Sequence, residues 1–329
     1  MKAIRCAAYG PPESLRLEEI PAPQLRAGQA LVSVRAAGVN FVDALCMQGT
    51  YQIRPSLPFI PGMEVAGVVT AVADGVVCVK PGDRVAGMTG IGGGYAEQAA
   101  IAADRLVPLP DGMDFATGAG FMLTYCTSLY ALENRGHLRP GENLLVLGAA
   151  GGVGLAAVDL GKAMGARVIA AASSADKLEK CRAMGAAEII NYETQDLKER
   201  VRELTQGAGA DVIYDPVGGK YAEPALRASA WKGRYLVVGF ANGAIPRLPL
   251  NLTLLKGCEI VGVDWGQFSA RFPDEAAPVL ARLMRLFAEG AITPCVTQTY
   301  PLARAGDALR DLLSRRVIGK AVLLLDGGA

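Results

Sequence analysis

From residue 144 onward, short apolar runs alternate with segments of helical period, and this alternation constrains the fold more than any other feature. The short runs predict strands, and the periodic segments between most of them predict helices. Strands joined by crossover helices form a parallel, doubly wound α/β sheet of the Rossmann type. The expected strands are 144–148, 167–171, 188–191, 211–215, 234–239 and 259–263, and the expected helices include 152–164, 175–184, 196–205 and 221–231.

The chain before this region has a different pattern. Short β-branched runs at 30–39, 64–73 and 83–88 are separated by Gly and Pro turn signals, which predict an irregular or barrel-like β domain. The C-terminal tail contains no further βα unit of the central type, so we expect it to return to this first domain. The Rossmann unit is then an insertion, with expected bounds of 1–122 and 265–329 for the β-rich domain and 123–264 for the Rossmann domain.

A glycine-rich turn follows the first expected strand and predicts a dinucleotide site. The segment VLGAAGGVG matches the GxGxxG pattern, except that Ala149 takes the first glycine position. Glycines allow the backbone to approach a pyrophosphate, and the following helix N-terminus offers free N–H groups and partial positive charge. A purely structural glycine turn is the alternative. The residues expected to hold the pyrophosphate are Ala150, Gly151, Gly152 and Val153.

The end of the second expected strand lacks the acid that NAD-preferring sites use to bind the ribose 2′-OH. Ala172 stands about where that acid is expected, and Ser173, Ser174 and Lys177 follow it. Two hydroxyl donors and an ammonium suit a 2′-phosphate, so the sequence predicts NADP(H) as the cofactor. The alternative is that the serines only cap a helix and that the lysine is a solvated charge.

The composition is that of an ordinary globular protein. Of 329 residues 51% are hydrophobic, and 33 Lys and Arg balance 32 Asp and Glu, so no basic excess indicates a nucleic-acid partner. The first ten residues lack the features of a signal peptide, and the apolar run 144–172 is too rich in Gly and Ala for a membrane span. Seven scattered cysteines without a CxxC pair indicate free, buried thiols and a cytoplasmic location.

Four motifs together resemble a known family. The segments AAGGVG, PGMEVAGVV (61–69), KPGDRVAG (80–87) and DVIYDPVGG (211–219) are similar to the medium-chain dehydrogenase/reductase superfamily. Within it, the chain resembles the zinc-independent quinone oxidoreductases, the group that includes zeta-crystallin. The resemblance implies a GroES-like catalytic domain made from both chain ends around the Rossmann domain. It also implies a homodimer formed by pairing edge strands, here 259–263.

The differences from zinc alcohol dehydrogenases indicate chemistry without a metal. Those enzymes carry a zinc-binding Cys where this sequence has Asn40, and Gly-His-Glu where it has Gly62-Met63-Glu64. The four-Cys structural zinc loop is also absent from 88–104. Catalytic zinc needs about three protein ligands, and the single histidine, His137, lies in a distant loop. We therefore expect no metal site.

The resemblance also implies site residues. Asn40, Asp43 and Tyr51 are expected to line the nicotinamide end of the site, where Tyr51 could donate a hydrogen bond to the acceptor oxygen. A second tyrosine found in some relatives is Leu45 here, which weakens a claim that a tyrosine proton donor is essential. The alternative is local: a turn with an Asx-type bond for Asn40 and Asp43, and a packed aromatic for Tyr51.

Further cofactor contacts follow from the same resemblance. Thr127 is expected to contact the nicotinamide, and Tyr192 is expected to lie against the 2′-phosphate. Phe240 and Ala241 are expected to meet the nicotinamide through backbone groups. The alternatives are an ordinary helix hydroxyl for Thr127 and plain surface packing for Tyr192.

The function expected from these features is NADPH-dependent, metal-free hydride transfer to quinones. The first alternative is a reductase of 2-alkenals or enoyl thioesters on the same scaffold, because a conjugated acceptor of either kind delocalises the incoming charge onto oxygen. The second is a crystallin-like protein that binds nucleotide or RNA, or senses NADPH, without turnover. The expected partners are a small quinone or enone and a second copy of the chain.

Overall fold

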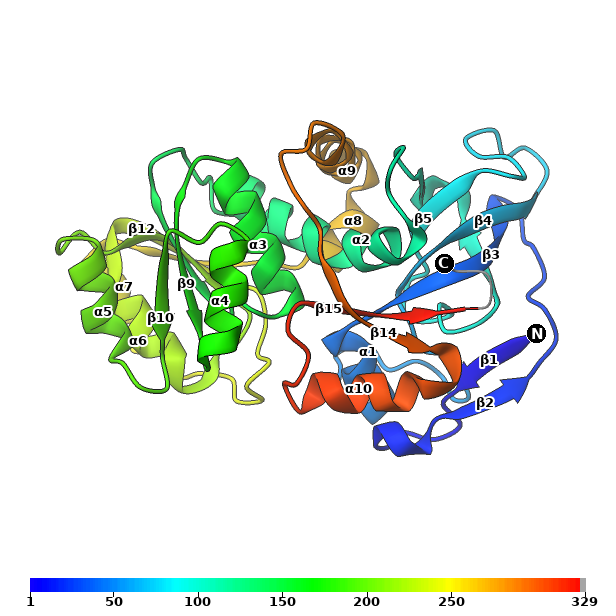
Figure 1. Cartoon of the computed structure of the whole chain (residues 1–329), viewed down its shortest axis with the longest axis horizontal. Helices are drawn as coiled ribbons and strands as arrows, with labels where there is room; N and C mark the ends of the chain where they lie inside the picture. The colour runs from blue at the N-terminus through cyan, green and yellow to red at the C-terminus, as the bar shows by residue number, and fades with distance from the viewer. Residues whose placement is uncertain (326–329) are drawn as a thin grey trace. The chain divides into compact units, whose positions relative to one another are not determined.

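The computed structural model describes residues 1–325 (Figure 1). The chain forms two compact units. The first contains Met1–Leu123 and the chain from Pro294 onward, and the second contains Thr124–Thr293. Among residues 1–325, no helix is long and apolar enough to cross a membrane.

The second unit is a parallel sheet with helices on both faces. Its strand order is β10-β9-β8-β11-β12-β13, and every neighbouring pair is parallel. In Figure 1, helices α3 and α4 lie on one face of this sheet, and α5 and α6 lie on the other. The predicted doubly wound arrangement is confirmed. The elements are β8 (Asn143–Leu147), α3 (Gly152–Ala163), β9 (Arg167–Ala172), α4 (Ala175–Ala183), β10 (Glu188–Asn191), α5 (Leu197–Leu204), β11 (Ala210–Asp215), α6 (Ala222–Arg227), β12 (Ser229–Val237), α7 (Asn251–Lys256), β13 (Glu259–Gly262), α8 (Trp265–Arg271) and α9 (Pro273–Ala288).

Side chains of successive strand residues point to opposite faces of this sheet, so both faces are apolar. Leu145 and Leu147 of β8 belong to the cluster that includes residues of α5 and α6. Leu144 faces the other way, because a Cβ on Gly161 of α3 would meet its Cδ2 at 2.5 Å. Buried apolar strands on both faces are what a sheet covered by two helical layers requires.

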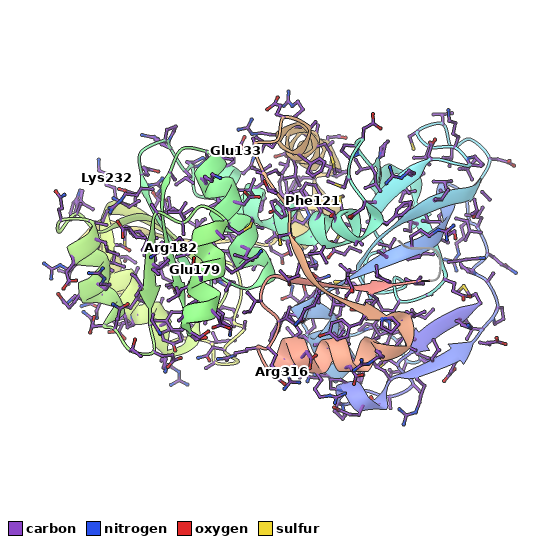
Figure 2. All side chains as sticks on the ribbon, in the orientation of Figure 1. Phe121, Glu133, Glu179, Arg182, Lys232 and Arg316 are labelled. Carbon is purple, nitrogen blue, oxygen red and sulfur yellow. The ribbon has the colours of Figure 1, made fainter. Side chains whose placement is uncertain are left out.

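The helices of this unit are amphipathic. On α4, Leu178 and Cys181 are buried, whereas Glu179 and Arg182 are exposed and stand out from the ribbon in Figure 2. The same view labels Phe121, a residue of the first unit that is fully buried on α2 (Phe115–Leu129). Burial of one helix face holds each helix against its sheet, since isolated helices of this length are marginal in water.

The first unit is β-rich and is completed by the C-terminal tail. Its larger sheet has the order β14-β15-β3-β4-β5-β7, and β6 pairs with β3. Strand β15 is antiparallel to β3, so the tail returns to the first domain as the sequence predicts. The elements are β1 (Lys2–Arg5), β2 (Arg16–Glu19), β3 (Gln29–Val39), α1 (Phe41–Gln48), β4 (Glu64–Val72), β5 (Arg84–Met88), β6 (Gln98–Ala102), β7 (Leu106–Pro108), β14 (Val296–Pro301), α10 (Ala305–Leu313) and β15 (Lys320–Leu324).

The second division between the units lies after Thr293, whereas the expected return to the first domain was at residue 265. Two interactions keep the intervening chain in the second unit. Phe268 of α8 stacks on Tyr130 with ring centroids 4.4 Å apart, and the buried carboxylate of Asp159 on α3 accepts the Thr293 N–H at 2.7 Å. Asp159 also accepts the Tyr125 hydroxyl at 2.8 Å, so one carboxylate binds both ends of the unit.

The sequence from 115 to 136 has a helical period, which predicts one helix ending near Gly136, and the structure differs from this prediction near that end. The α-helix stops at Leu129, and the turn Tyr130–Arg135 is of the π type. The chain then reaches His137, which is exposed at a positive φ of 44°.

Five of the seven cysteines are buried as predicted, but Cys78 is exposed and Cys295 is partly exposed.

Candidate functional site

The glycine-rich turn joins β8 to α3 by a tight backbone path. Gly148 has a positive φ of 55°, and Gly151 is the N-cap residue of α3. A Cβ on Gly154 would lie 2.3 Å from the Gly148 carbonyl oxygen and 2.8 Å from backbone atoms of Ala149. Glycine at position 154 is therefore needed for the first turn of α3 to approach the loop.

The start of α3 presents the features of an anion site. The first N–H groups of a helix have no partner within it and carry the positive end of its dipole. Those groups belong here to Gly152, Val153 and Gly154. Gly151 is exposed and Ala150 is buried, so Ala150 can meet a ligand only through its backbone.

A buried hydroxyl pair supports this turn from below, and sequence reasoning missed it. The fully buried Ser128 hydroxyl donates to the Val153 carbonyl oxygen at 3.0 Å and lies 2.9 Å from the Tyr214 hydroxyl. Ser128 directly follows Thr127, which is half-buried on α2. A hydroxyl in the apolar segment YCTSLYAL is the sequence signal that could have found it, because buried hydroxyls need partners.

The expected 2′-phosphate residues meet where β9 and β10 end side by side. The two strands are parallel, with Ala172 paired to Asn191. The Tyr192 N–H donates to the Ala172 carbonyl oxygen at 3.2 Å, which fixes Tyr192 beside the end of β9. Lys177 Nζ donates to Ser173 Oγ at 3.4 Å. A neutral strand end, a hydroxyl and an ammonium are thus close together.

Ser174 has a different partner. Its hydroxyl hydrogen-bonds to Asp176, and that bond holds the pKa of the exposed Asp176 carboxyl below its usual value. Next to Tyr192, the ring of Tyr221 lies with its centroid 4.2 Å away, and its hydroxyl donates to Glu193. Ser173 and Lys177 are therefore better placed to meet an anion than Ser174.

Phe240 and Ala241 lie in the loop after β12, and both are exposed. The Ala241 N–H donates to the Pro216 carbonyl oxygen at 3.0 Å, so this loop is bound to the one that follows β11. The Asp215 carboxylate accepts the N–H groups of Val217 and Gly218, each at 2.8 Å, and stabilises the same region. The backbone groups expected to face a nicotinamide are thus held at the carboxyl ends of two neighbouring strands.

In the first unit, Asn40 and Asp43 form the first turn of α1. Asn40 is the N-cap, and its N–H donates to Asp43 Oδ2 at 2.9 Å. The same oxygen accepts the Tyr95 hydroxyl at 3.0 Å. Asp43 Oδ1 is buried without a hydrogen-bond partner. Burial raises the pKa of Asp43 to about 7, against the opposing effects of the two hydrogen bonds and of the Lys320 charge, while the Glu64 charge adds to the rise.

A buried ion pair next to Asn40 was not predicted from the sequence. Glu64 at the start of β4 is 0% exposed, and Lys320 at the start of β15 is 6% exposed. Lys320 Nζ lies 2.6 Å from Glu64 Oε1 and 2.5 Å from Asn40 Oδ1. Asn40 Nδ2 donates to Glu64 Oε1 at 2.9 Å, and Glu64 Oε2 accepts the Leu123 N–H at 2.8 Å. The three side chains form one closed network.

Two glycines leave the space for this network. A Cβ on Gly38 would lie 2.3 Å from Glu64 Oε1 and 2.4 Å from the Ala119 carbonyl oxygen. A Cβ on Gly120 would lie 2.9 Å from Lys320 Cγ. Any larger residue at either position would displace one of the two charged side chains.

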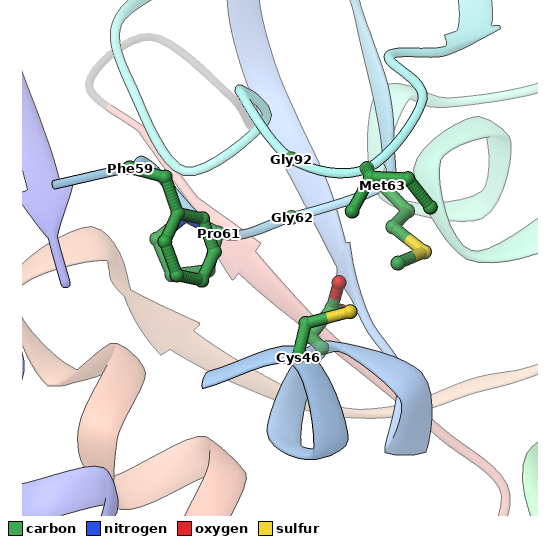
Figure 3. Close-up of a pocket in the computed structure, with 8 residues that line it drawn as sticks. Cys46, Phe59, Pro61, Gly62, Met63 and Gly92 are labelled. Atoms are coloured by element: carbon green, nitrogen blue, oxygen red, sulfur yellow. The ribbon is translucent and has the colours of Figure 1, made fainter. Parts of the chain in front are cut away.

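A small pocket lies beside this network within the first unit. Figure 3 shows Cys46 of α1 facing the Met63 side chain, with Phe59, Pro61, Gly62 and Gly92 around them. Asp43 also lines this pocket. Tyr51 lies in the loop after α1, half-buried, with its N–H donating to the Leu45 carbonyl oxygen at 3.2 Å.

The residues at the motif positions of a zinc site do not suit a metal ion. The Lys320 ammonium already occupies the side-chain oxygens of Asn40 and Glu64, and a second cation there would be repelled. Met63 offers only a thioether. Within the described part of the chain, no group of three or more His, Cys, Asp or Glu side chains could hold a metal ion.

Two domain families match the sequence. The family described as "Alcohol dehydrogenase GroES-like domain" matches residues 26–111, and the family described as "Zinc-binding dehydrogenase" matches residues 152–282. These matches lie in the β-rich unit and in the parallel-sheet unit respectively.

Individual relatives are similar over nearly the whole chain. A quinone oxidoreductase of Pseudomonas aeruginosa is 38% identical, with 98% of this chain and 99% of that protein covered. A quinone oxidoreductase of Rattus norvegicus is 36% identical, with 99% and 98% covered. The structure of Escherichia coli quinone oxidoreductase complexed with NADPH has a TM-score of 0.92 at 32% identity and covers 98% of this chain and 100% of that one. The predicted fold class and resemblance are confirmed.

Proposed function

We propose a reaction for this chain from its family, since the chain belongs to the quinone oxidoreductases of the medium-chain dehydrogenase/reductase superfamily. The proposed activity is NADPH-dependent hydride transfer to a quinone. The observation that carries it is the pairing of Lys177 with Ser173 at a strand end that bears no carboxylate. Structures of the Escherichia coli and Thermus thermophilus quinone oxidoreductases complexed with NADPH support the same cofactor.

The residues of the second unit fit this cofactor. The pyrophosphate would be held at the start of α3 by the backbone of Ala150, Gly151, Gly152 and Val153. Because Gly154 has no Cβ, the first turn of α3 can lie close to this loop. Ser173, Ser174, Lys177 and Tyr192 would hold the 2′-phosphate, and Thr127, Phe240 and Ala241 would contact the nicotinamide. When bound, NADPH supplies the hydride.

The first unit would supply the groups that serve the acceptor, which we propose to be Asn40, Asp43 and Tyr51. Asp43 and Tyr51 would act on the acceptor directly, and Asn40 would act through its hydrogen bond to Asp43. A quinone that accepts a hydride also needs a proton. The carboxyl of Asp43, whose pKa burial raises to about 7, can hold a proton at neutral pH, and its Oδ1 is free of other partners. Tyr51 would donate a hydrogen bond to the acceptor oxygen.

The proposed reaction does not use a metal. The two side-chain oxygens nearest the motif positions are occupied by Lys320, so the site cannot take up a divalent cation without expelling the ammonium. A quinone needs little help from a Lewis acid, because the charge of the hydride delocalises onto its oxygens. Electrostatic stabilisation by fixed protein groups is sufficient for such an acceptor.

We also propose a homodimer through the edge strand β13. In the described sheet this strand pairs only with β12, and its Ile260 is partly exposed. Nearby apolar side chains are also exposed, with Leu254 at 79%, Leu255 at 65% and Trp231 at 68%. Gly257, which follows α7, would meet the Trp231 ring if it carried a Cβ, so these residues are close together. A second copy would cover both the edge and this apolar surface.

A cytoplasmic location is proposed from the cysteines. Cys78 is exposed, and no disulfide holds its thiol. Free thiols on a protein surface persist in a reducing compartment.

The test is steady-state oxidation of NADPH and of NADH by a panel of quinones, 2-alkenals and crotonyl-CoA, with and without a chelator. We expect NADPH to be preferred, quinones to be reduced fastest, and the chelator to have no effect. Lys177→Met should raise the KM for NADPH at least tenfold and leave the KM for NADH unchanged. The matched control is Lys198→Met on α5, a half-buried lysine paired with Glu199, which should change neither KM.

Equal use of both cofactors by the wild type would contradict the role of Lys177. Loss of activity with the chelator would contradict the metal-free reaction. A higher turnover with an alkenal or thioester than with any quinone would mean that the substrate is a conjugated alkenal or enoyl thioester and not a quinone.

A further inference from the structure

The ion pair of Lys320 and Glu64 has no role in the reaction as proposed so far. We propose that Lys320, anchored by Glu64, is a positioning residue that fixes the orientation of the Asn40 carboxamide and, through it, the first turn of α1. The kinetic part of this inference rests on the proposed function.

The hydrogen bonds define one orientation of Asn40. Its Oδ1 accepts from Lys320, whereas its Nδ2 donates to Glu64 Oε1. Reversing the carboxamide would place its NH2 group against the ammonium and its oxygen against the carboxylate. Both contacts would be repulsive, so the ion pair permits a single orientation of the amide. The other Nδ2 proton points towards the Gly38 carbonyl oxygen, 3.5 Å away.

This orientation leaves Asn40 little capacity to bind an acceptor directly. Its oxygen and one N–H already have charged partners, and the residue is 6% exposed. Its backbone N–H meanwhile binds Asp43 Oδ2. Asn40 therefore connects the ion pair to the Asp43 carboxyl, and the side chains facing Asp43 are Tyr95, Cys46, Lys320 and Glu64.

Stability alone does not explain the ion pair. Removing two charges from water is costly, and replacing a buried pair with apolar residues of similar size is often neutral or stabilising. The chain also needs glycine at positions 38 and 120 to accommodate the two side chains, and glycine weakens strands and helices. A positioning role accounts for a feature that packing energy does not require.

The test compares Lys320→Met, Glu64→Gln and the double variant with the wild type. A double variant of the half-buried pair Glu142–Arg234 in the second unit, Glu142→Gln with Arg234→Met, is the control for loss of an ion pair. Thermal unfolding, kcat and KM for quinone reduction are measured for each protein. The exchange rate of the Asn40 side-chain amide protons is measured by NMR with 15N-asparagine, and Asn40→Asp assigns the signal.

We expect Lys320→Met to lower the unfolding temperature, because a buried carboxylate then lacks its partner. The Lys320→Met/Glu64→Gln double variant should recover much of that loss. In it the amide protons of Asn40 should exchange at least tenfold faster, and kcat should fall about tenfold to hundredfold with little change in KM, as for a misplaced catalytic group. The control double variant should keep the wild-type exchange rate and kcat.

Wild-type exchange and a kcat within twofold of wild type in the double variant would show that the pair is only structural, and would overturn the inference. If the double variant does not fold, the single variants decide. Glu64→Gln keeps Lys320 beside Asn40, so faster exchange in Lys320→Met than in Glu64→Gln supports positioning, and equal rates refute it. If the wild type reduces no quinone, the proposed function fails while amide exchange still tests the inference.

Discussion

Two glycines of the same turn, Gly151 and Gly154, are predicted to respond differently to alanine. In Gly154→Ala the new Cβ would lie 2.3 Å from the Gly148 carbonyl oxygen and 2.8 Å from two backbone atoms of Ala149. Neither neighbour is a flexible side chain, so the first turn of α3 must move away from the loop. Overpacking of this kind costs about 1–3 kcal/mol of unfolding free energy. For a domain of 150–250 residues this lowers the unfolding temperature by roughly 2–12 °C.

Gly151→Ala is the matched control for stability. Its Cβ would meet only the Gly148 oxygen at 3.4 Å, an ordinary contact, and its φ of −80° suits alanine. We therefore expect an unfolding temperature close to that of the wild type. The methyl group at this exposed position would instead obstruct a pyrophosphate, so NADPH affinity should fall at least tenfold.

Thermal unfolding and calorimetric titration with NADPH measure both effects. An unchanged unfolding temperature in Gly154→Ala would refute the argument from close approach. Wild-type NADPH affinity in Gly151→Ala would show that the cofactor does not rest on this turn.

Three further predictions use other parts of the molecule. Ala172→Asp should shift the preference from NADPH towards NADH at least tenfold, measured as the ratio of kcat/KM, because a carboxylate repels the 2′-phosphate. Since the folded-state pKa of Asp43 is raised to about 7, its ionisation opposes folding, and the free energy of unfolding should fall as the pH rises from about 4 through 7. Asp43→Asn should lack this fall in denaturant titrations at about pH 5 and about pH 8. Ile260→Lys should convert a dimer to a monomer in light scattering, whereas Leu17→Lys on β2 should not; a monomeric wild type would rule out the interface.

The spacing of apolar residues along the sequence was sufficient to predict much of the fold. Buried strands such as 144–148 and 211–215 are short apolar runs, and their predicted bounds differ from the structure by a residue or so. The ends of elements were harder to predict. The π-type turn Tyr130–Arg135 continues the helical pattern, so nothing local distinguishes it from the α-helix before it. The second division between the units falls after Thr293, whose N–H binds the carboxylate of Asp159, a residue far away in the sequence.

The candidate site shows the same limit. Gly154 and Lys177 could be singled out from the sequence because the contacts that they make, with Gly148 and Ser173 respectively, involve neighbours a few residues away. The Lys320–Glu64 pair joins positions 256 residues apart, and no local pattern links them. The available signal was a charged residue at the start of each of two apolar strands, in MEVAGVV and in GKAVLLL. A charge in such a place is almost never fully buried without a partner.

The position of β15 between β14 and β3 has a consequence for biosynthesis. The second unit is one continuous segment, so a ribosome delivers all of it before the C-terminal strands emerge. It can fold during translation, because domains generally fold as units in order of synthesis. The first unit has to wait. Until Lys320 leaves the exit tunnel, the Glu64 carboxylate has no cation and strand β3 lacks one neighbour. A nascent chain that has not yet released β15 therefore contains a second unit able to fold and a first unit whose sheet is incomplete.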